Sequence, residues 1–263
     1  MKLPARTPQH VCSPQTGSGS PDETADLNVQ VVSHRGLSGQ EPENSLAAFR
    51  AAVARGVEAI EFDVRQTLNG VVVVAHDAEV AGLSIGQTGY EQLSAEASEL
   101  CTFAEALAAI PLRCRLDIEI KTPGIEEAVL RELGGARSSD EYVITSFYDQ
   151  AIARTKALDP TVRVGLLLGQ ENPRHRLQTR LSELYPAARL RSCGADFVAP
   201  HWQLLRLGFL RRMRRLGYPV WVWAVNSTAL LETLMHRPEV GAVITDHPLE
   251  AVRLRDDGLF LSS

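Results

Sequence analysis

Eight short apolar segments, each followed by residues with helical spacing, constrain the fold of this 263-residue chain more than any other feature. Strand–helix repeats of this kind form parallel sheets, and eight of them make a (β/α)8 TIM barrel. The alternative is a doubly wound open sheet, but no GxGxxG sequence follows the first segment. The eight segments are 29–33, 58–65, 114–120, 142–146, 162–168, 196–199, 220–225 and 242–245.

One connection differs from the others, because Asn69-Gly70 separates the runs EFDVRQTL and VVVVAHD. An Asn-Gly pair between two strand-like runs predicts a β-hairpin with a two-residue type I′ turn. Counting outward from that turn places Asp63 opposite His76. Directly opposed side chains share one face of an antiparallel pair, so His76 is expected beside Asp63. We therefore expect a barrel with a hairpin excursion after its second strand.

Local signals also predict where helices begin and end. Asn44 or Ser45 can cap the first helix, and Gly56 has the position of the glycine that follows a helix. Thr102 and Glu105 have the spacing of a capping box at the start of another helix.

The N-terminal residues 1–28 are rich in Pro, Ser, Thr and Gly without periodicity, and we expect a flexible tail there. Residues 29–263 are expected to form a single domain. No apolar run reaches the ~18 residues of a membrane span, and the N-terminus lacks the apolar segment of a secretory signal. The four cysteines show no CxxC spacing, so we expect free thiols, a cytoplasmic location and no stable membrane insertion. No feature indicates an oligomeric state.

Polar residues gather where the predicted strands end. The C-terminal ends of the strands form the catalytic face of a TIM barrel, so polar residues there indicate chemistry. The residues at or near these ends are His34, Glu61, Asp63, Glu119, Lys121, Ser146, Asn226 and Asp246.

Three of these residues are carboxylates that can converge on one point. Glu61 and Asp63 lie two positions apart in one strand and share a face, while Glu119 ends the neighbouring strand. Adjacent buried like charges need a cation for compensation. Oxygen ligands alone favour Mg²⁺ or Ca²⁺ over zinc. The alternative is that each carboxylate pairs with one of the many arginines at a polar rim.

His34 and His76 end apolar runs beside this cluster and are candidates for a general acid and a general base. They could instead be structural residues or metal ligands, although the absence of HxH and HExxH disfavours a zinc site. Arg35 and Lys121 supply the cations that an anionic substrate needs. The alternative for Lys121 is a simple ion pair with Glu119.

Two further stretches have simpler explanations. Residues 210–217 carry four arginines, but their apolar residues keep helical spacing, so the arginines form the solvated face of an outer helix. The net charge of −5 also argues against a nucleic-acid partner. Trp221 and Trp223 share a strand face, and packing in the core is the expected role of both.

Taken in order, these motifs resemble those of the glycerophosphodiester phosphodiesterases, a family within the phospholipase-C-like TIM-barrel phosphodiesterases. The resemblance extends from residue 31 to about residue 248. Its main motifs are His34-Arg35-Gly36, Pro42-Glu43-Asn44-Ser45, Glu61-Phe62-Asp63-Val64, His76-Asp77 and Glu119-Ile120-Lys121. Weaker matches are Ser146-Phe147, Trp223-Ala224-Val225-Asn226 and Ile244-Thr245-Asp246.

The resemblance implies that a small-molecule glycerophosphodiester is hydrolysed to an alcohol and sn-glycerol 3-phosphate with one divalent cation, Mg²⁺, Ca²⁺ or Mn²⁺. The attacking hydroxyl belongs to water or to the substrate itself. The roles that the resemblance implies are metal binding by Glu61, Asp63 and Glu119, acid and base catalysis by His34 and His76, phosphate contact by Arg35 and Lys121, and substrate-side contacts by Glu43, Phe147 and Trp223.

The chain departs from the family pattern at three places, which concern substrate choice. Ser45 stands where Thr is frequent, Ala224 follows Trp223 where Thr is common, and AEVAGLSIGQTGY replaces an Arg-Thr-Thr-like run after Asp77. The alternatives are therefore a lysophospholipase D-like lipid phosphodiesterase and a catalytically silent barrel that binds phosphodiesters. No loop is long or apolar enough to indicate the exposed apolar rim that a lipid substrate needs.

Overall fold

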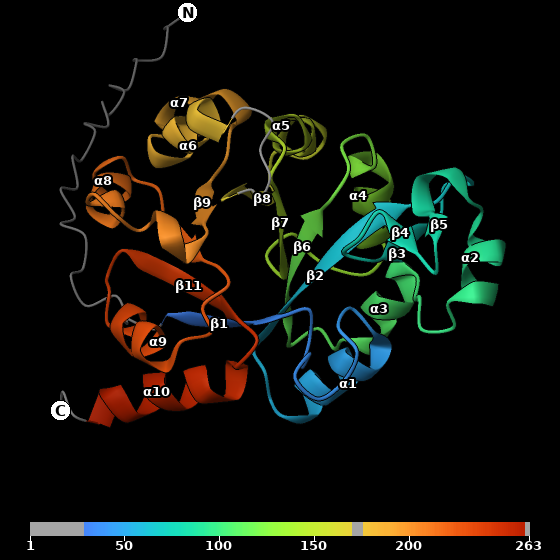
Figure 1. Ribbon diagram of the computed structural model, residues 1–263, viewed down its shortest axis with the longest axis horizontal. Helices are drawn as coiled ribbons and strands as arrows, with labels where there is room; N and C mark the ends of the chain where they lie inside the picture. Colours follow the sequence, from blue (N-terminus) through green and yellow to red (C-terminus); the bar gives the residue numbers. More distant parts are fainter. Residues whose placement is uncertain (1–28, 170–175, 261–263) are drawn as a thin grey trace, which may run out of the picture.

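The computed structural model, which describes residues 29–169 and 176–260, is a closed barrel of eight parallel strands with helices outside it (Figure 1). β1 is hydrogen-bonded to both β2 and β11, and this pairing closes the sheet. The predicted TIM barrel is thus confirmed and the open sheet is excluded. The barrel strands are β1 (Gln30–His34), β2 (Ala59–Gln66), β6 (Arg115–Ile120), β7 (Tyr142–Ser146), β8 (Arg163–Leu168), β9 (Phe197–Pro200), β10 (Val220–Val222) and β11 (Val240–Thr245).

Helices cover the outer surface of the barrel, with one exception (Figure 1). They are α1 (Leu46–Ala54), α2 (Tyr90–Glu96), α3 (Phe103–Ala109), α4 (Glu126–Gly134), α5 (Asp149–Leu158), α6 (Arg176–Leu184), α7 (Ala187–Cys193), α8 (Phe209–Arg215), α9 (Thr228–Met235) and α10 (Pro248–Phe260), with 3-10 turns η1 (Ile85–Gln87) and η2 (Trp202–Leu204). The exception is α2, which packs its Leu93 against Val73 of β3 (Val72–Val74) and Ile85 of η1. The capping predictions are confirmed. Ser45 caps α1, Gly56 follows it with φ 75°, and Thr102 with Glu105 forms a capping box on α3.

The predicted hairpin is present, but its register was wrong by one residue. β3 (Val72–Val74) runs antiparallel to β2, with Val64 opposite Val74, and a separate ribbon pairs β4 (Glu79–Val80) with β5 (Leu83–Ser84). Asp63 consequently lies opposite Ala75, whose backbone N–H donates to the Asp63 carbonyl at 3.0 Å. The turn therefore does not pair Asp63 with His76.

The register differs because the turn has three residues instead of two. The backbone N–H of Thr67 donates to Val71 O at 2.9 Å, so three residues rather than two form the loop. Gly70 has φ 86°, whereas Asn69 is not in the left-handed conformation that a type I′ turn requires. The Asn69 side chain accepts a hydrogen bond from the backbone N–H of Tyr90 at 3.0 Å, which ties the loop to α2. The three-residue turn with glycine last is the next most common hairpin connection.

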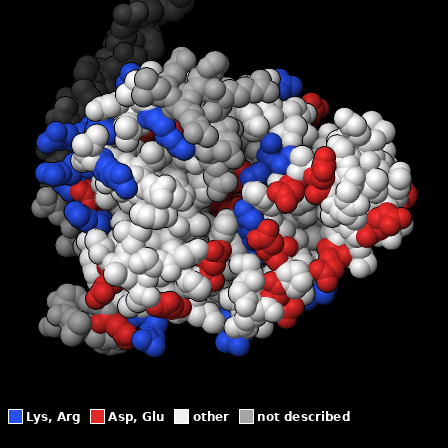
Figure 2. All heavy atoms as spheres, in the orientation of Figure 1, with Lys and Arg blue, Asp and Glu red and all other residues white. Residues whose placement is uncertain are grey.

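The predicted explanations for the arginine-rich helix and for the cysteines agree with the structure. On α8, Phe209 and Met213 are buried, and Figure 2 shows the basic side chains gathered on the exposed surface over that helix. Cys101 and Cys114 are buried free thiols, and burial raises their pKa values to about 12 and about 11. The expected tail at 1–28 and Cys12 lie outside the described residues. In the part that the structure describes, no helix is long and apolar enough to cross a membrane.

A layer of aromatic side chains fills the barrel interior. The Phe197 and Trp221 rings lie 4.5 Å apart within an inner apolar cluster, so Trp221 is a core residue as expected. Gly165 faces Phe197 across the β8–β9 pair, and a Cβ atom at Gly165 would lie only 2.3 Å from the Phe197 ring. The absence of a side chain at Gly165 is therefore what allows a ring as large as phenylalanine to fit there.

We expect Gly165→Ala to destabilise the protein by ~1–3 kcal/mol, because the added methyl group overpacks the barrel interior. The free energy of unfolding in urea measures this effect. Gly134→Ala is the matched control, since nothing lies within 4 Å of the position that its added Cβ atom would take and alanine favours a helix. Equal stability of the two variants would contradict the packing argument.

Candidate active site

The three predicted carboxylates converge at the C-terminal ends of β2 and β6. The parallel register places Asp63 beside Glu119, and strand alternation puts Glu61 on the same face as Asp63. All three side chains are buried, and each offers an oxygen atom within 4.8 Å of the others. The convergence of these three carboxylates, predicted from their spacing in the sequence, is therefore confirmed.

Two cationic side chains partly compensate this cluster. Lys121 Nζ lies 2.8 Å from Glu119 Oε1 and 3.3 Å from Asp63 Oδ1. Arg35 Nε lies 3.3 Å from Asp63 Oδ2, and its guanidinium also pairs with Glu43 at 2.8 Å. Lys121 thus forms the ion pair with Glu119 that was the alternative interpretation, but it contacts two carboxylates rather than one.

The backbone after β1 is held in an unusual conformation that serves this cluster. Arg35 has φ 57°, and its N–H donates to Glu61 Oε2 at 3.1 Å. Gly36 follows with φ 79°, and a Cβ there would lie 2.9 Å from Ala48 on α1. Non-glycine residues in this region store strain of about 1–3 kcal/mol, and such strain concentrates at functional sites.

Asn44 is a site residue whose role sequence reasoning missed. Its Nδ2 donates to Asp63 Oδ2 at 2.8 Å, and its Oδ1 accepts the Asp63 N–H at 3.2 Å. The sequence suggested Asn44 only as a possible helix cap, a role that Ser45 performs instead. The left-handed φ of 56° orients Asn44 toward Asp63, and Asn tolerates this conformation better than most residues do. Asp63 Oδ1 keeps no hydrogen-bond partner among the described residues.

Burial and mutual repulsion perturb the pKa values of the three carboxyl groups. Burial, reinforced by Asp63, raises the pKa of Glu119 to about 8 despite the opposing charge of Lys121. Burial also raises the pKa of Glu61 well above its usual value, with further contributions from Asp63 and two other carboxylates. Burial acts in the same direction on Asp63, but Lys121 and Arg35 outweigh it and lower the pKa of Asp63. The raised pKa values favour the protonated forms of Glu61 and Glu119, and binding of a divalent cation would displace such protons.

His34 is oriented by a carboxylate from the far end of the chain. Its Nδ1 lies 2.7 Å from Asp246 Oδ1, and its Nε2 lies 3.9 Å from Glu61 Oε2. Asn226 holds Asp246 in turn, because its side-chain oxygen accepts the Asp246 N–H at 3.0 Å and its amide donates to the carboxylate. A carboxylate on Nδ1 fixes the tautomer that leaves Nε2 facing the site. The signal for Asp246 was its position just after the last strand, but no sequence pattern indicated its partner.

His76 reaches the same region although the hairpin register differs from the prediction. β3 ends at Val74, so His76 lies beyond the regular pleat, where Arg65 donates two hydrogen bonds to its carbonyl at 3.0 and 2.7 Å. Its Nδ1 lies 2.8 Å from Asp77 Oδ1. A positive charge on His76 adds to the larger effects of Lys121 and Arg35, which together lower the pKa of Asp63.

Aromatic side chains lie beside Lys121. The Phe147 ring is 5.9 Å from Lys121 Nζ and meets Trp223 edge to face at 5.4 Å. Trp223 Nε1 donates to Ala199 O at 2.8 Å, which fixes the indole. Ser146, by contrast, is buried and donates to the Ile120 carbonyl at 2.7 Å, so it supports the strand ends rather than the site.

A cavity of about 470 Å³ is lined by Glu43, Asn44 and His76, among other residues. The Glu43 side chain is 53% exposed and holds the Arg35 guanidinium. The structure thus brings together the candidate metal ligands, Arg35 and Lys121. His34, His76, Glu43, Phe147 and Trp223 lie around them.

The model of the glycerophosphoryl diester phosphodiesterase family matches residues 34–250. The chain belongs to this family. A glycerophosphodiester phosphodiesterase of Caldanaerobacter subterraneus subsp. tengcongensis is 26% identical over 252 residues, which cover 87% of this chain and 98% of that protein. The match thus extends over nearly the whole relative.

Solved structures of the family show the same fold. The glycerophosphodiester phosphodiesterase of Thermotoga maritima superposes with a TM-score of 0.71 at 26% identity, covering 86% of this chain and 98% of that one. An Oleispira antarctica phosphodiesterase, solved in complex with the product sn-glycerol-3-phosphate, has a TM-score of 0.73 at 24% identity over 88% of this chain and 98% of that one.

The raised carboxyl pKa values predict how the stability of the cation-free protein depends on pH. Glu119 has an ordinary pKa of 4.5 and a folded-state pKa of about 8. Between these values the folded state keeps a proton that the unfolded chain has released, so stability present below pH 4.5 is lost as the pH rises toward 8. We expect the melting temperature in EDTA to fall across this window, and Glu119→Gln to make the fall shallower.

Calorimetry of the wild type, Glu119→Gln and Glu232→Gln across this pH range measures the effect. Removal of one such titration changes the slope by at most about 1.4 kcal/mol per pH unit. Glu232 is exposed, so its variant should keep the wild-type slope. A Glu119→Gln slope equal to that of the wild type would show that Glu119 does not hold the extra proton.

Proposed function

We propose that this chain is a metal-dependent glycerophosphodiester phosphodiesterase that produces an alcohol and sn-glycerol 3-phosphate. The observation that carries the proposal is the buried cluster of Glu61, Asp63 and Glu119, with two histidines and two cationic side chains around it at the catalytic end of the barrel. Membership in the family and the names of its relatives support the same reaction.

The donor set fits a hard divalent cation. Glu61, Asp63 and Glu119 offer only oxygen atoms, Asp63 Oδ1 lacks a hydrogen-bond partner in the described chain, and two of the carboxyl groups have raised pKa values. Oxygen-only sites suit Mg²⁺, Ca²⁺ or Mn²⁺. When bound, such a cation polarises the phosphoryl group and offsets the charge that develops on its oxygens.

Two carboxylate-held histidines then supply proton transfer. His34 is held by Asp246 and His76 by Asp77, in each case through Nδ1, which leaves Nε2 free for the reaction. One histidine removes the proton from the attacking hydroxyl, and the other protonates the departing alcohol. Because both pairs have the same form, the proposal gives the two roles to the pair of histidines without dividing them between His34 and His76.

The remaining residues bind and orient the substrate. Arg35 and Lys121, which lie beside the carboxylates that would hold the cation, would contact the non-bridging phosphate oxygens of the substrate. Glu43 orients Arg35, and Phe147 with Trp223 forms an aromatic wall for the rest of the substrate.

One observation favours a second candidate, a lysophospholipase D-like activity on lipid phosphodiesters. Contrary to the sequence-based expectation of no apolar rim, Tyr148, Trp202 and Leu207 are 44%, 39% and 74% exposed. They lie in the segments that follow β7 and β9, and these segments start at the catalytic end of the barrel. Exposed apolar groups at the mouth of a site can contact an acyl chain.

A substrate and metal panel tests both candidates. We expect the wild type to cleave glycerophosphocholine only with added Mg²⁺, Ca²⁺ or Mn²⁺, and expect Glu61→Gln or Asp63→Asn to abolish cleavage, because each removes a charged ligand. Glu127→Gln, on the exposed side of α4, is the control with unchanged activity. Cleavage that persists in EDTA would contradict the metal role.

The same panel includes lysophosphatidylcholine to decide between the candidates. Preferential cleavage of this lipid, lowered by Leu207→Ser while cleavage of glycerophosphocholine stays unchanged, identifies the lipid phosphodiesterase. Preferential cleavage of glycerophosphocholine identifies the proposed function.

The Asp246–His34 contact makes a separate prediction. We expect Asp246→Asn to lower kcat about 10- to 100-fold with little change in KM, because the imidazole loses its orientation and its carboxylate partner. In the double variant with His34→Ala, the loss should be no larger than for His34→Ala alone, since the two residues act as a unit. Asp196→Asn, which alters an ion pair with Lys156 away from the site, is the control. Additive losses would show that Asp246 acts independently of His34.

A further inference from the structure

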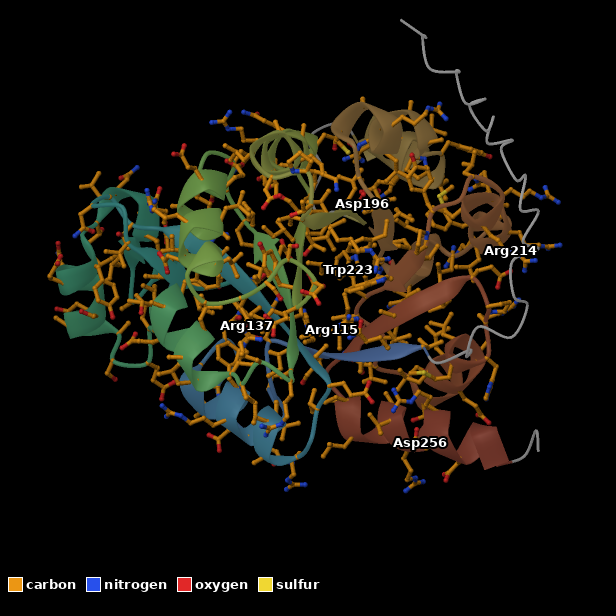
Figure 3. The ribbon with its side chains drawn as sticks, turned by 180° about the vertical axis from the view of Figure 1, so that it is seen from behind. Arg115, Arg137, Asp196, Arg214, Trp223 and Asp256 are labelled. Carbon is orange, nitrogen blue, oxygen red and sulfur yellow. The ribbon has the colours of Figure 1, made fainter. Side chains whose placement is uncertain are left out.

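A second cavity lies at the opposite mouth of the barrel from the carboxylate cluster. It has a volume of about 300 Å³ and is lined by Gln30, Ala59, Arg115 and Arg163, among other residues. These four are the first residues of β1, β2, β6 and β8, whereas the carboxylate cluster lies toward the C-terminal ends. Seen from behind, Arg115 lies near the middle of the barrel, while Arg214 of α8 lies at the outer edge (Figure 3).

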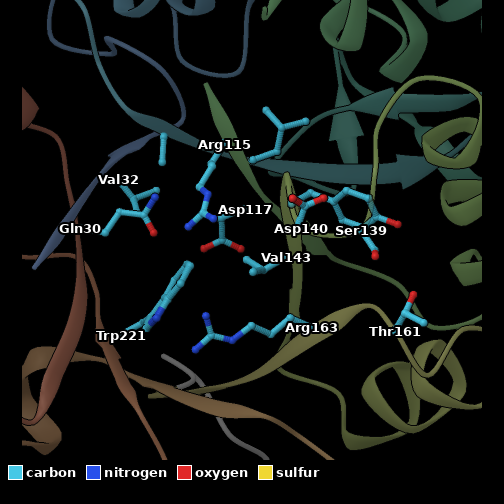
Figure 4. A pocket seen from close by; sticks show the side chains of 13 residues that line it. Gln30, Val32, Arg115, Asp117, Ser139, Asp140, Val143, Thr161, Arg163 and Trp221 are labelled. Atoms are coloured by element: carbon cyan, nitrogen blue, oxygen red, sulfur yellow. The ribbon is translucent and has the colours of Figure 1, made fainter. Parts of the chain in front are cut away.

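A buried carboxylate points into this cavity. Asp117 is 1% exposed, and its Oδ1 accepts a hydrogen bond from Thr145 Oγ1 at 2.8 Å. Its Oδ2 has no hydrogen-bond partner among the described residues, although it is shielded from solvent. A buried polar atom without a partner is uncommon, and it costs free energy until a donor reaches it. Figure 4 shows this carboxylate at the centre of the cavity.

Two arginines, Arg115 and Arg163, line the cavity together with Asp117 but form no ion pair with it. In the described part of the chain, no side chain forms an ion pair or hydrogen bond with the guanidinium group of Arg115 or Arg163, although the exposed Asp140 at the cavity interacts electrostatically with Arg115. Arg163 stacks over Trp221 and Phe197, with its guanidinium carbon 6.0 and 5.4 Å from the ring centroids. In the close-up, both guanidinium groups point toward the space beside Asp117 and Trp221 (Figure 4).

We propose that this cavity binds a small organic anion that also carries a hydrogen-bond donor. Arg115 and Arg163 present the planar forks that recognise phosphate and carboxylate groups. Asp117 Oδ2 accepts the hydroxyl or ammonium donor of the ligand, and Trp221 forms an apolar wall. The volume matches the lower end of small-molecule sites, so the occupant is a metabolite rather than a macromolecule.

The site is separate from the proposed hydrolytic function and would persist if that function failed. The same recognition chemistry occurs in a polyol phosphate, a hydroxy acid and an amino acid. The test uses one probe from each source, sn-glycerol 3-phosphate, D-glycerate and β-alanine, together with sulfate, an anion without a donor.

Calorimetric titration of the full chain in EDTA measures binding of each probe to the wild type, Arg115→Gln/Arg163→Gln and Arg113→Gln. We expect at least one donor-bearing probe to bind the wild type more tightly than sulfate does. Affinity should fall about tenfold or more in the double arginine variant, because charged hydrogen bonds are lost. Arg113, an exposed arginine outside the cavity, is the matched control and should leave affinity unchanged.

The arginine variants change exposed side chains, so a melting temperature close to that of the wild type verifies that the barrel is intact. Asp117→Asn adds a second measurement, in which the donor-bearing probe should lose affinity while sulfate should not. Failure of all three donor-bearing probes to bind at millimolar concentration would overturn the proposal. Equal affinity in the wild type and the double arginine variant would also overturn it.

Discussion

Mutual repulsion among three buried carboxylates is the constraint on which the site depends. Parallel pairing of β2 with β6 places Asp63 beside Glu119, and the pleat places Glu61 on the same face. Burial removes the water that would separate these charges, so they must be compensated by protons or cations. Burial, together with the neighbouring carboxylates, raises the pKa values of Glu61 and Glu119, and the charges of Arg35 and Lys121 offset these effects only in part.

Closure of the barrel connects the ends of the chain to this cluster. His34 and Asp246 are 212 positions apart, and they meet because β1 pairs with β11, with Ser33 beside Thr245. An open sheet with the same strands would leave β1 and β11 unpaired and His34 without its carboxylate. The fold therefore does more than display the site, since it creates the pair that orients one of the two histidines.

Features that depend on local periodicity could be predicted from the sequence. Strand alternation identified the three carboxylates, and the β–α repeats identified the barrel, with strand ends differing from the prediction by a few residues. The hairpin register could not be obtained in the same way. Asn-Gly favours a two-residue turn locally, but contacts between Asn69 and α2 select a three-residue turn instead.

Contacts between residues far apart in the sequence could not be predicted either. Asn44 reaches Asp63 only because its backbone adopts a left-handed conformation, and Asp246 reaches His34 only because the barrel closes. Both residues were visible in the sequence, one as a possible cap and one at a strand end. The partner of each is 19 or 212 positions away, which no local pattern encodes.

The same alternation that builds the catalytic end continues through the barrel to the other mouth. Asp117 and Glu119 lie two positions apart on β6 and point inward, with Asp117 toward the N-terminal cavity and Glu119 toward the carboxylate cluster. Phe197 and Trp221 pack in the interior, so the two ends are separated by side chains rather than joined by a channel. The two inward-facing carboxylates of this strand thus face different spaces, although Asp117 is in register with Glu61 and contributes to its raised pKa.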